Sequence, residues 1–359
     1  MNIGIITLNG NFNYGNRLQL YALYRIYQEL GFNPTVLFPP ERHNRKKELA
    51  RFAKNELKRL VGRPVQPHSP EDVMSPERLS AFRAFSGLMS SRCVTENELG
   101  RLEEDFDYFA VGSDQVWNPL LIEGYEDWYF LKFSPAKKRI AVAPSIGLDE
   151  LDMKQTALLK NGVQGFERLS VREETGARLI KQCSGRMAEV LVDPTLIINS
   201  GDWQKVANKD FVPDDSYIFT YLLGGCGKDA RNVLDLVCEQ RVKRIVSLSD
   251  MELPGEPAAG PAEFIALIAG ADHVITDSYH ASVFSMLMGV PLTIVKRSDG
   301  AGMFSRLENL SSIFGLDNKI YGSPSFDISA ADDYTDVHPT LDNQRSKFIQ
   351  YLNSKPACG

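Results

Sequence analysis

The first 38 residues, MNIGIITLNGNFNYGNRLQLYALYRIYQELGFNPTVLF (1–38), decide the fold. Ile3 to Leu8 form an apolar run of strand length, and a polar, turn-forming cluster follows from Asn9 to Gly15. Asn16 to Leu30 place apolar side chains at helical spacing, and Thr35 to Phe38 form a second apolar run. A strand, a loop, a helix and another strand in this order predict a parallel sheet of the doubly wound type.

The same alternation of apolar runs and amphipathic segments continues to the end of the chain. Further strands are expected at 106–111, 139–143, 169–171, 190–192, 216–223, 244–248, 273–276 and 292–295. Further helices are expected at 76–89, 153–161, 175–183, 229–240, 262–269, 280–289, 305–314 and 341–353. A second α/β unit begins near residue 215, after a predicted linker, and a cleft between two such units is where a ligand is expected.

The composition excludes several classes of protein. The 359 residues are 43% hydrophobic and 24% charged, which is typical of a globular chain long enough for two domains. The net charge of −6 argues against a globally basic nucleic-acid binder. Five scattered cysteines without a C-x-x-C pair, together with no H-x-H or H-E-x-x-H pattern, predict reduced thiols, no metal site and no cofactor. The N-terminus lacks the basic region of a signal peptide, so we expect a cytoplasmic protein.

Two loops that follow predicted strands carry the first candidate residues. In the loop before the first helix, Asn13, Gly15, Asn16 and Arg17 either donate to a ligand at a helix N-terminus or form a plain turn with an asparagine cap. The second loop spans 111–119, and its polar and aromatic residues include Ser113, Asp114, Gln115 and Trp117. Turn chemistry does not explain the glutamine and the tryptophan, and the set suits a hydroxyl-rich ligand.

The remaining candidates are cations and one histidine. Arg172 leaves a strand and either pairs with a neighbouring glutamate or faces a phosphate or carboxylate in the cleft. Ser278 and His280 lie where a strand runs directly into a helix, so backbone N–H groups there are available to an anion. Lys296-Arg297 end another strand, and Arg306 begins a helix, a position that favours anions over cations.

Taken together, the ordered set of motifs resembles the polysaccharide pyruvyl transferase family. The matching stretches are 13–19 (NYGNRLQ), 111–118 (VGSDQVWN), 143–147 (APSIG), 170–173 (SVRE), 192–195 (VDPT), 276–280 (TDSYH) and 305–306 (SR). The resemblance implies an α/β fold with two Rossmann-like domains in a GT-B-like arrangement and an interdomain cleft. It also implies transfer of a pyruvyl group from phosphoenolpyruvate to two hydroxyls of a sugar in a cell-surface polysaccharide precursor, as a ketal, with release of phosphate.

The resemblance also suggests a division of roles. We expect an acceptor-side domain over 1–205, a donor-side domain over 206–335 and a C-terminal helix within 336–359 that packs back on the first domain. His280 is the candidate general acid, since an imidazole suits proton transfer near neutrality, and Asp114 the candidate acceptor ligand or base. Arg172, Ser278 and Arg306 are assigned to the donor. The other loop residues are assigned to the acceptor: Asn13, Gly15, Asn16, Arg17, Ser113, Gln115 and Trp117.

Two alternatives remain open, and one segment has two interpretations. Ser278 stands where better-known family members have arginine, which leaves a GT-B-like glycosyltransferase with a nucleotide-sugar donor as the alternative. A non-catalytic glycan-binding protein on the same fold is a third possible function.

Between Arg42 and Arg63, nine basic residues stand against two acidic ones, so the segment carries +7 and the rest of the chain −13. Its helical pattern suits either contact with an anionic membrane beside a lipid-linked acceptor or packing on the first domain.

Overall fold

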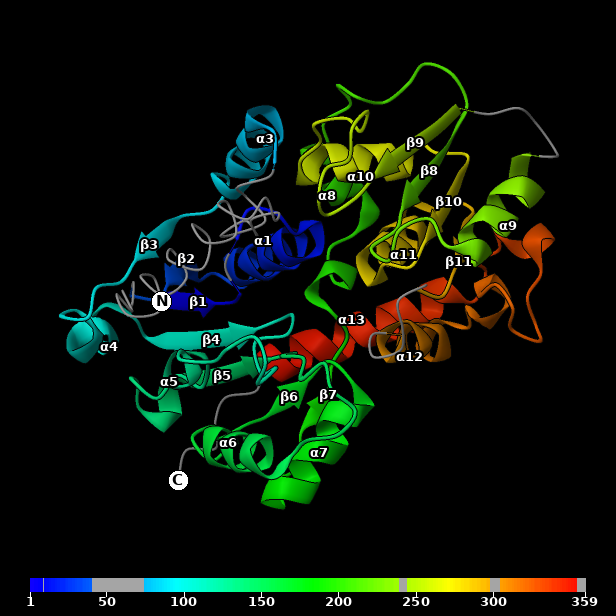
Figure 1. Ribbon diagram of the computed structural model, residues 1–359. Coiled ribbons are helices and arrows are strands. Elements are labelled where there is room, and N and C mark those ends of the chain that lie inside the picture. The colour runs from blue at the N-terminus through cyan, green and yellow to red at the C-terminus, as the bar shows by residue number, and fades with distance from the viewer. Residues whose placement is uncertain (9, 41–73, 239–243, 298–303, 354–359) are drawn as a thin grey trace, which may run out of the picture.

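The computed structural model describes residues 1–8, 10–40, 74–238, 244–297 and 304–353, and these contain two larger parallel sheets and a short two-stranded one (Figure 1). The strands of the first are β1 (Asn2–Ile6), β2 (Asn33–Phe38), β3 (Ser91–Cys93), β4 (Tyr108–Gly112) and β5 (Arg139–Val142). Their order is β3-β2-β1-β4-β5, and every neighbouring pair is parallel. The doubly wound sheet predicted from the opening residues is therefore present.

The second sheet is built from the second half of the chain. Its strands are β8 (Tyr217–Tyr221), β9 (Arg244–Leu248), β10 (His273–Thr276) and β11 (Leu292–Ile294), in the order β11-β10-β8-β9. All of its pairs are parallel. A short parallel pair, β6 (Ser170–Val171) and β7 (Glu189–Val190), continues beyond β5, where the Ser170 hydroxyl donates to the Ala141 carbonyl. The α/β class with two Rossmann-like units is confirmed.

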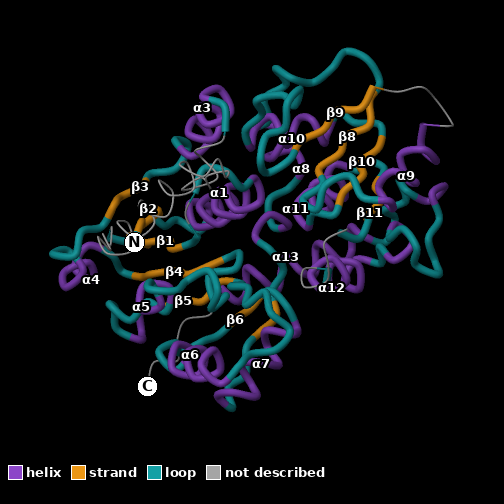
Figure 2. The backbone as a smooth tube through the Cα atoms, in the orientation of Figure 1, coloured by secondary structure: helices purple, strands orange, loops and turns teal. Residues whose placement is uncertain are grey.

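Helices connect and cover the strands in both halves (Figure 2). The main ones are α1 (Tyr14–Glu29), α3 (Pro76–Ser86), α6 (Met153–Val163), α7 (Glu174–Ser184), α9 (Lys228–Cys238), α10 (Pro261–Ala269), α11 (Tyr279–Met288), α12 (Ser305–Phe314) and α13 (Val337–Asn353). The short ones are α4 (Leu102–Asp105), α5 (Glu126–Tyr129) and α8 (Ser200–Val206). The sequence pattern did not predict β3, which is polar, or α8, which lies inside the expected linker.

The two halves meet along α1, whose buried face packs on α10 and α11. Tyr14 stacks on Phe264 with ring centroids 4.7 Å apart, and its hydroxyl donates to the Ala259 carbonyl at 2.8 Å. Farther along the interface, Trp203 meets Phe284 edge to face at 4.9 Å. One hydrophobic core therefore runs from the first half into the second, and it holds the N-termini of α1 and α11 close together.

Helix α13 joins the C-terminal end of the described chain to the first sheet. The Tyr351 hydroxyl donates to the Ala141 carbonyl on β5 at 2.8 Å, and Arg345 donates to the Leu196 carbonyl at 3.0 Å. The domain boundaries themselves stay a prediction, and the basic segment 42–63 lies outside the described residues. No helix within the described ranges combines the length and apolar character needed to span a membrane.

Candidate functional site

A cleft of about 450 Å³ lies where the carboxyl ends of both sheets face each other. From the first half it is lined by the start of α1 and the loop after β4, and from the second half by the residues that follow β8, β9, β10 and β11. Every lining segment outside the helices thus follows a strand, which is the position of ligand sites in doubly wound sheets. The sequence placed its candidate loops at this edge for the same reason.

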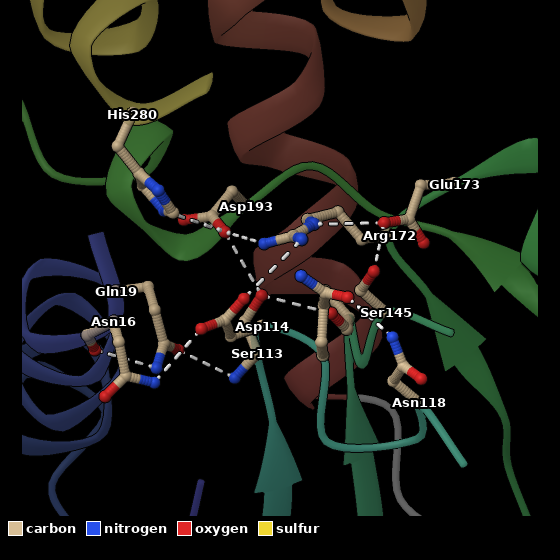
Figure 3. A network of polar contacts seen from close by, with 12 residues as sticks. Asn16, Gln19, Ser113, Asp114, Asn118, Ser145, Arg172, Glu173, Asp193 and His280 are labelled. Atoms are coloured by element: carbon tan, nitrogen blue, oxygen red, sulfur yellow. Dashed lines mark hydrogen bonds and ion pairs between the residues drawn. The ribbon is translucent and has the colours of Figure 1, made fainter. Parts of the chain in front are cut away.

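His280 stands in the first turn of α11, at the wall where the two halves meet (Figure 3). Its Nε2 lies 3.6 Å from the Asp193 Oδ2 and is shut off from solvent. The other edge of the ring lies against Gly15 of α1, where a built Cβ is 2.0 Å from Nδ1. Only a residue without a Cβ fits there, so the glycine at this position is explained by close approach of the histidine.

Asp193, which follows β7, is a buried carboxylate that connects several site residues. Its Oδ2 accepts from Arg172 Nη1 at 2.8 Å and from the Ser113 hydroxyl at 3.2 Å. Its Oδ1 accepts from the Thr195 amide and hydroxyl at 3.0 and 2.8 Å. Burial raises the pKa of Asp193, but the hydrogen bond and charge of His280 and the charge of Arg172 outweigh it, so the pKa lies well below its usual range. Asp193 lies in the 192–195 motif (VDPT), but the sequence alone predicted no role for it.

Arg172 lies beneath the cleft and does not line it. Its guanidinium is 2% exposed and is surrounded by three carboxylates, those of Asp193, Glu173 at 3.4 Å and Asp114 at 3.8 Å. Of the two interpretations of Arg172, the one in which the arginine pairs with neighbouring acids therefore describes this residue. The expectation that it clamps a donor is wrong in placement, because its charge is already matched inside the protein.

Asp114 and Asn16 bring the first two predicted loops together. The Asn16 Nδ2 donates to the Asp114 Oδ2 at 3.1 Å, and both residues line the cleft. Asp114 has a φ of 49°, a left-handed conformation that is uncommon for a residue with a side chain and is found often at functional sites. The backbone around it is fixed, because the Asp114 carbonyl accepts from the amides of Ser145 and Val116.

Cationic side chains reach the cleft from the second half. Arg297 and Arg306 line it, as does Ser278, the residue directly before α11. The pKa of the Arg306 guanidinium is lowered by burial and by the nearby charge of Arg172. An anion bound beside Arg306 would relieve both effects, since it replaces lost solvation and balances two positive groups.

Several predicted residues lie behind the cleft wall. The prediction that Trp117 presents its ring to a ligand is wrong: it is fully buried, stacks on Phe130 at 5.5 Å and donates to the Tyr129 carbonyl. Ser113 is also fully buried, and Arg17 is 2% exposed and faces a different cavity. These three residues shape the loops instead of contacting a ligand.

The other predicted loop residues do line the cleft. Gly15 and Gln115 are among them, and Gln115 accepts from the Asn118 amide at 2.7 Å. Asn13 lines the cleft too and also caps α1, its side chain accepting from the Asn16 amide at 2.9 Å. The ligand-site and asparagine-cap interpretations of this loop are thus both compatible with its geometry.

The structure adds two carboxylates that the sequence did not single out. Asp277 follows β10 and accepts from the amides of Leu223 and Gly224 at 2.7 and 2.8 Å. Asp250 follows β9 and accepts from the Tyr221 hydroxyl. Burial raises the pKa of both, and both line the cleft opposite Arg297. A carboxylate directly after a strand was the available signal, as it was for Asp114.

Metal ligands were not predicted, and the part of the chain that the structure describes holds no group of three or more histidine, cysteine, aspartate or glutamate side chains suited to a metal ion. The described residues that line the cleft do include one histidine, two arginines, three carboxylates and a helix N-terminus. This set can bind an anion, hold hydroxyl groups and transfer a proton.

Comparisons with known proteins give a family and a fold. The family model described as polysaccharide pyruvyl transferase matches residues 13–299. Among solved structures, the UDP-GlcNAc 2-epimerase of Methanocaldococcus jannaschii is similar with a TM-score of 0.50 and 13% identity, over 99% of this chain and 93% of that chain. The UDP-GlcNAc 2-epimerase of Neisseria meningitidis is similar with a TM-score of 0.47 and 11% identity, over 98% and 99%. A search of curated proteins gives no match.

Proposed function

This chain belongs to the polysaccharide pyruvyl transferase family, and from that premise we propose that it transfers the pyruvyl group of phosphoenolpyruvate to a sugar of a cell-surface polysaccharide precursor. The product is a ketal and the second product is phosphate. The observation that carries the proposal is that His280, in the first turn of α11, and Arg306, in the first turn of α12, line the same cleft. A proton donor and an anion site are the two groups that this reaction requires.

The donor is an enol phosphate with a carboxylate, so it needs several positive groups. Arg306 and Arg297 line the cleft, and the first N–H groups of α11 add fixed donors at Ser278. Ser278 replaces the arginine that better-known family members have there. We infer that Arg297, at the end of β11, supplies cationic charge in its place. Its guanidinium already faces Asp277 at 3.6 Å, so the carboxylate orients it without neutralising the cleft as a whole.

The chemical step begins with protonation of the donor's methylene carbon. His280 acts as the general acid, which makes the adjacent carbon electrophilic as an oxocarbenium-like centre. A sugar hydroxyl attacks this carbon, and Asp114 on the facing half holds that hydroxyl or accepts its proton. The amide of Asn16, bonded to Asp114 at 3.1 Å, fixes the carboxylate in place. Asn13 and Gln115 are available to bind further sugar hydroxyls.

The proposal is tested by measuring phosphate release from phosphoenolpyruvate in the presence of a panel of glycan acceptors. We expect acceptor-dependent release, reduced by roughly 100-fold or more in His280→Gln, because general acid catalysis contributes about 10²–10⁴-fold. His338→Gln changes an exposed histidine on α13 and serves as the matched control. The absence of release across the panel, together with the absence of phosphoenolpyruvate binding, would refute the proposal.

A GT-B-like glycosyltransferase is the second candidate, and two observations favour it. Ser278 offers no cation, and the carboxylates of Asp250 and Asp277 line the cleft, where they suit the hydroxyls of a nucleotide sugar. Thermal shift measurements with nucleoside diphosphates and with phosphoenolpyruvate distinguish the two. Stabilisation by the nucleotide alone would replace the pyruvyl transferase assignment.

We infer a place of action from the same chemistry. The proposed enzyme is cytoplasmic and acts on a sugar or lipid-linked glycan of an exopolysaccharide precursor. Peripheral contact through residues 42–63 stays a prediction, since these residues lie outside the described part of the chain. Co-sedimentation with anionic liposomes tests it, and a chain that stays in the supernatant would exclude it.

A further inference from the structure

The two nitrogens of His280 lie in different environments. Nε2 is shut off from solvent, faces the Asp193 Oδ2 at 3.6 Å and has no hydrogen-bond partner within 3.5 Å among the described residues. His280 nevertheless lines the cleft, and so does Gly15, against which the Nδ1 edge of the ring lies. The nitrogen on the side of the cleft is therefore Nδ1.

Asp193 is held in place independently of the histidine. Thr195 occupies its Oδ1 through two hydrogen bonds, while Arg172 and Ser113 approach its Oδ2. The side chain is fully buried and does not line the cleft. It cannot touch a ligand there, so any effect it has on the reaction passes through the residues around it.

The carboxylate of Asp193 stays ionised, because its pKa is lowered despite burial. An ionised carboxylate accepts hydrogen bonds and donates none. A histidine nitrogen that faces it must carry a proton to make a favourable contact, and this fixes which tautomer the neutral ring adopts. The same logic sets the orientation of the histidine in Ser-His-Asp hydrolases.

We propose that Asp193 is a positioning residue that holds the Nε2–H of His280, so that Nδ1 is the nitrogen that delivers the proton to the substrate. The chemical part of this inference rests on the proposed pyruvyl transfer. The orientation of the ring does not, and it can be measured without a substrate.

The proton balance of the step follows from this assignment. The Nδ1–H proton of the imidazolium moves to the methylene carbon of phosphoenolpyruvate, which becomes a methyl group, and the ring is left neutral with its proton on Nε2. The first sugar hydroxyl forms a C–O bond at the adjacent carbon, and its proton is taken up by a base. The second hydroxyl displaces phosphate, which leaves with the C–O electron pair and accepts the second hydroxyl proton. One ketal and one phosphate are formed.

The contact also links the two halves of the molecule at the site. Asp193 follows β7 in the first half, whereas His280 begins α11 in the second. Figure 3 places the two side chains directly opposite each other, with Arg172 and Asp114 on the far side of the aspartate. The acid is therefore correctly oriented only when the halves are in contact.

The experiment uses the full chain labelled with ¹⁵N-histidine and long-range ¹H–¹⁵N spectra recorded at a pH where imidazole is neutral. The His280 signals are assigned by their loss in His280→Gln. We expect the wild-type ring to carry its proton on Nε2. In Asp193→Asn the side-chain amide, if its NH₂ replaces Oδ2, donates to Nε2 and moves the ring proton to Nδ1.

Asp202→Asn is the matched control, because Asp202 is an exposed carboxylate on α8 that pairs with Lys205. It should leave the His280 signals unchanged. A wild-type ring protonated on Nδ1 would overturn the proposal. The wild-type spectrum decides this even where the variant does not fold.

Kinetics provide the second measurement. Asp193→Asn should lower kcat by roughly 100-fold or more, as a wrongly oriented acid does, while KM for phosphoenolpyruvate stays within about twofold because Asp193 does not line the cleft. A rise in KM at unchanged kcat would contradict a positioning role. If the wild-type chain shows no turnover at all, the proposed function fails, and the spectra still decide the orientation of His280.

Discussion

Replacing Gly15 with alanine tests whether the site depends on the close approach of α1 to His280. A Cβ at position 15 lies 2.0 Å from Nδ1 and 2.5 Å from the Cε1 and Cγ of the ring. Non-bonded atoms of this kind need about 3.5 Å, so the ring must move by roughly 1.5 Å. A displacement of about 1 Å of a catalytic group costs on the order of 10²-fold in rate. We therefore expect kcat for phosphate release to fall by at least about 100-fold.

The assay follows initial rates of phosphate release together with thermal unfolding. Overpacking costs about 1–3 kcal/mol, and alanine regains up to about 1 kcal/mol of helix propensity in α1, so the variant should remain folded. Gly100→Ala is the matched control, because nothing lies within 4 Å of a Cβ built there. A folded Gly15→Ala enzyme with the wild-type kcat would refute the packing argument and the role of His280 that depends on it.

Three further results are expected. Arg306→Ala should raise KM for phosphoenolpyruvate by roughly 10- to 100-fold, because a charged hydrogen bond worth about 1.5–3 kcal/mol is lost. The control Arg25→Ala, on the exposed face of α1, should leave KM unchanged. Trp117→Ala should lower the free energy of unfolding in urea by about 3–5 kcal/mol, because the ring fills the core; an effect on KM alone would contradict this. The lowered pKa of Asp193 means that its ionised form stabilises the fold above about pH 4, and this contribution is lost as pH falls through the lower folded-state pKa. Urea titrations from pH 5 to pH 2 should therefore show a shallower loss in Asp193→Asn, and parallel profiles would contradict it.

The fold was predictable because its signals are local. A strand such as β10 is a short apolar run, and the helix α12 has the bounds expected from its spacing, Ser305–Phe314. Features without such a signal were missed. The strand β3 has only three residues, SRC, which lie at a sheet edge and show no alternation of apolar and polar side chains. The helix α8 has seven residues and is stabilised by the Asn199 cap. Neither depends on a hydrophobic period that a sequence reveals.

The site was predictable in position and only partly in detail. Position follows from topology, since residues that follow parallel strands converge at one edge. Whether a side chain enters the cleft or turns inward depends on contacts between distant segments. Trp117 and Gln115 are two positions apart in the chain, yet one stacks on Phe130 in the core and the other lines the cleft. Nothing in the local sequence distinguishes them.

The assignment of Arg172 illustrates the same limit for charge. From the sequence, Arg172 could either bind the donor or pair with one of the two glutamates that follow it. Which role it takes depends on Asp193, 21 positions later, and on Asp114, 58 positions earlier, which the fold brings to 2.8 and 3.8 Å from the guanidinium. This buried cation has three acidic neighbours that balance its charge, and it is not among the residues that line the cleft. The consequence for the proposed mechanism is that Arg172 balances the negative charges under the cleft, while the described lining offers His280, Arg297 and Arg306 to a bound anion.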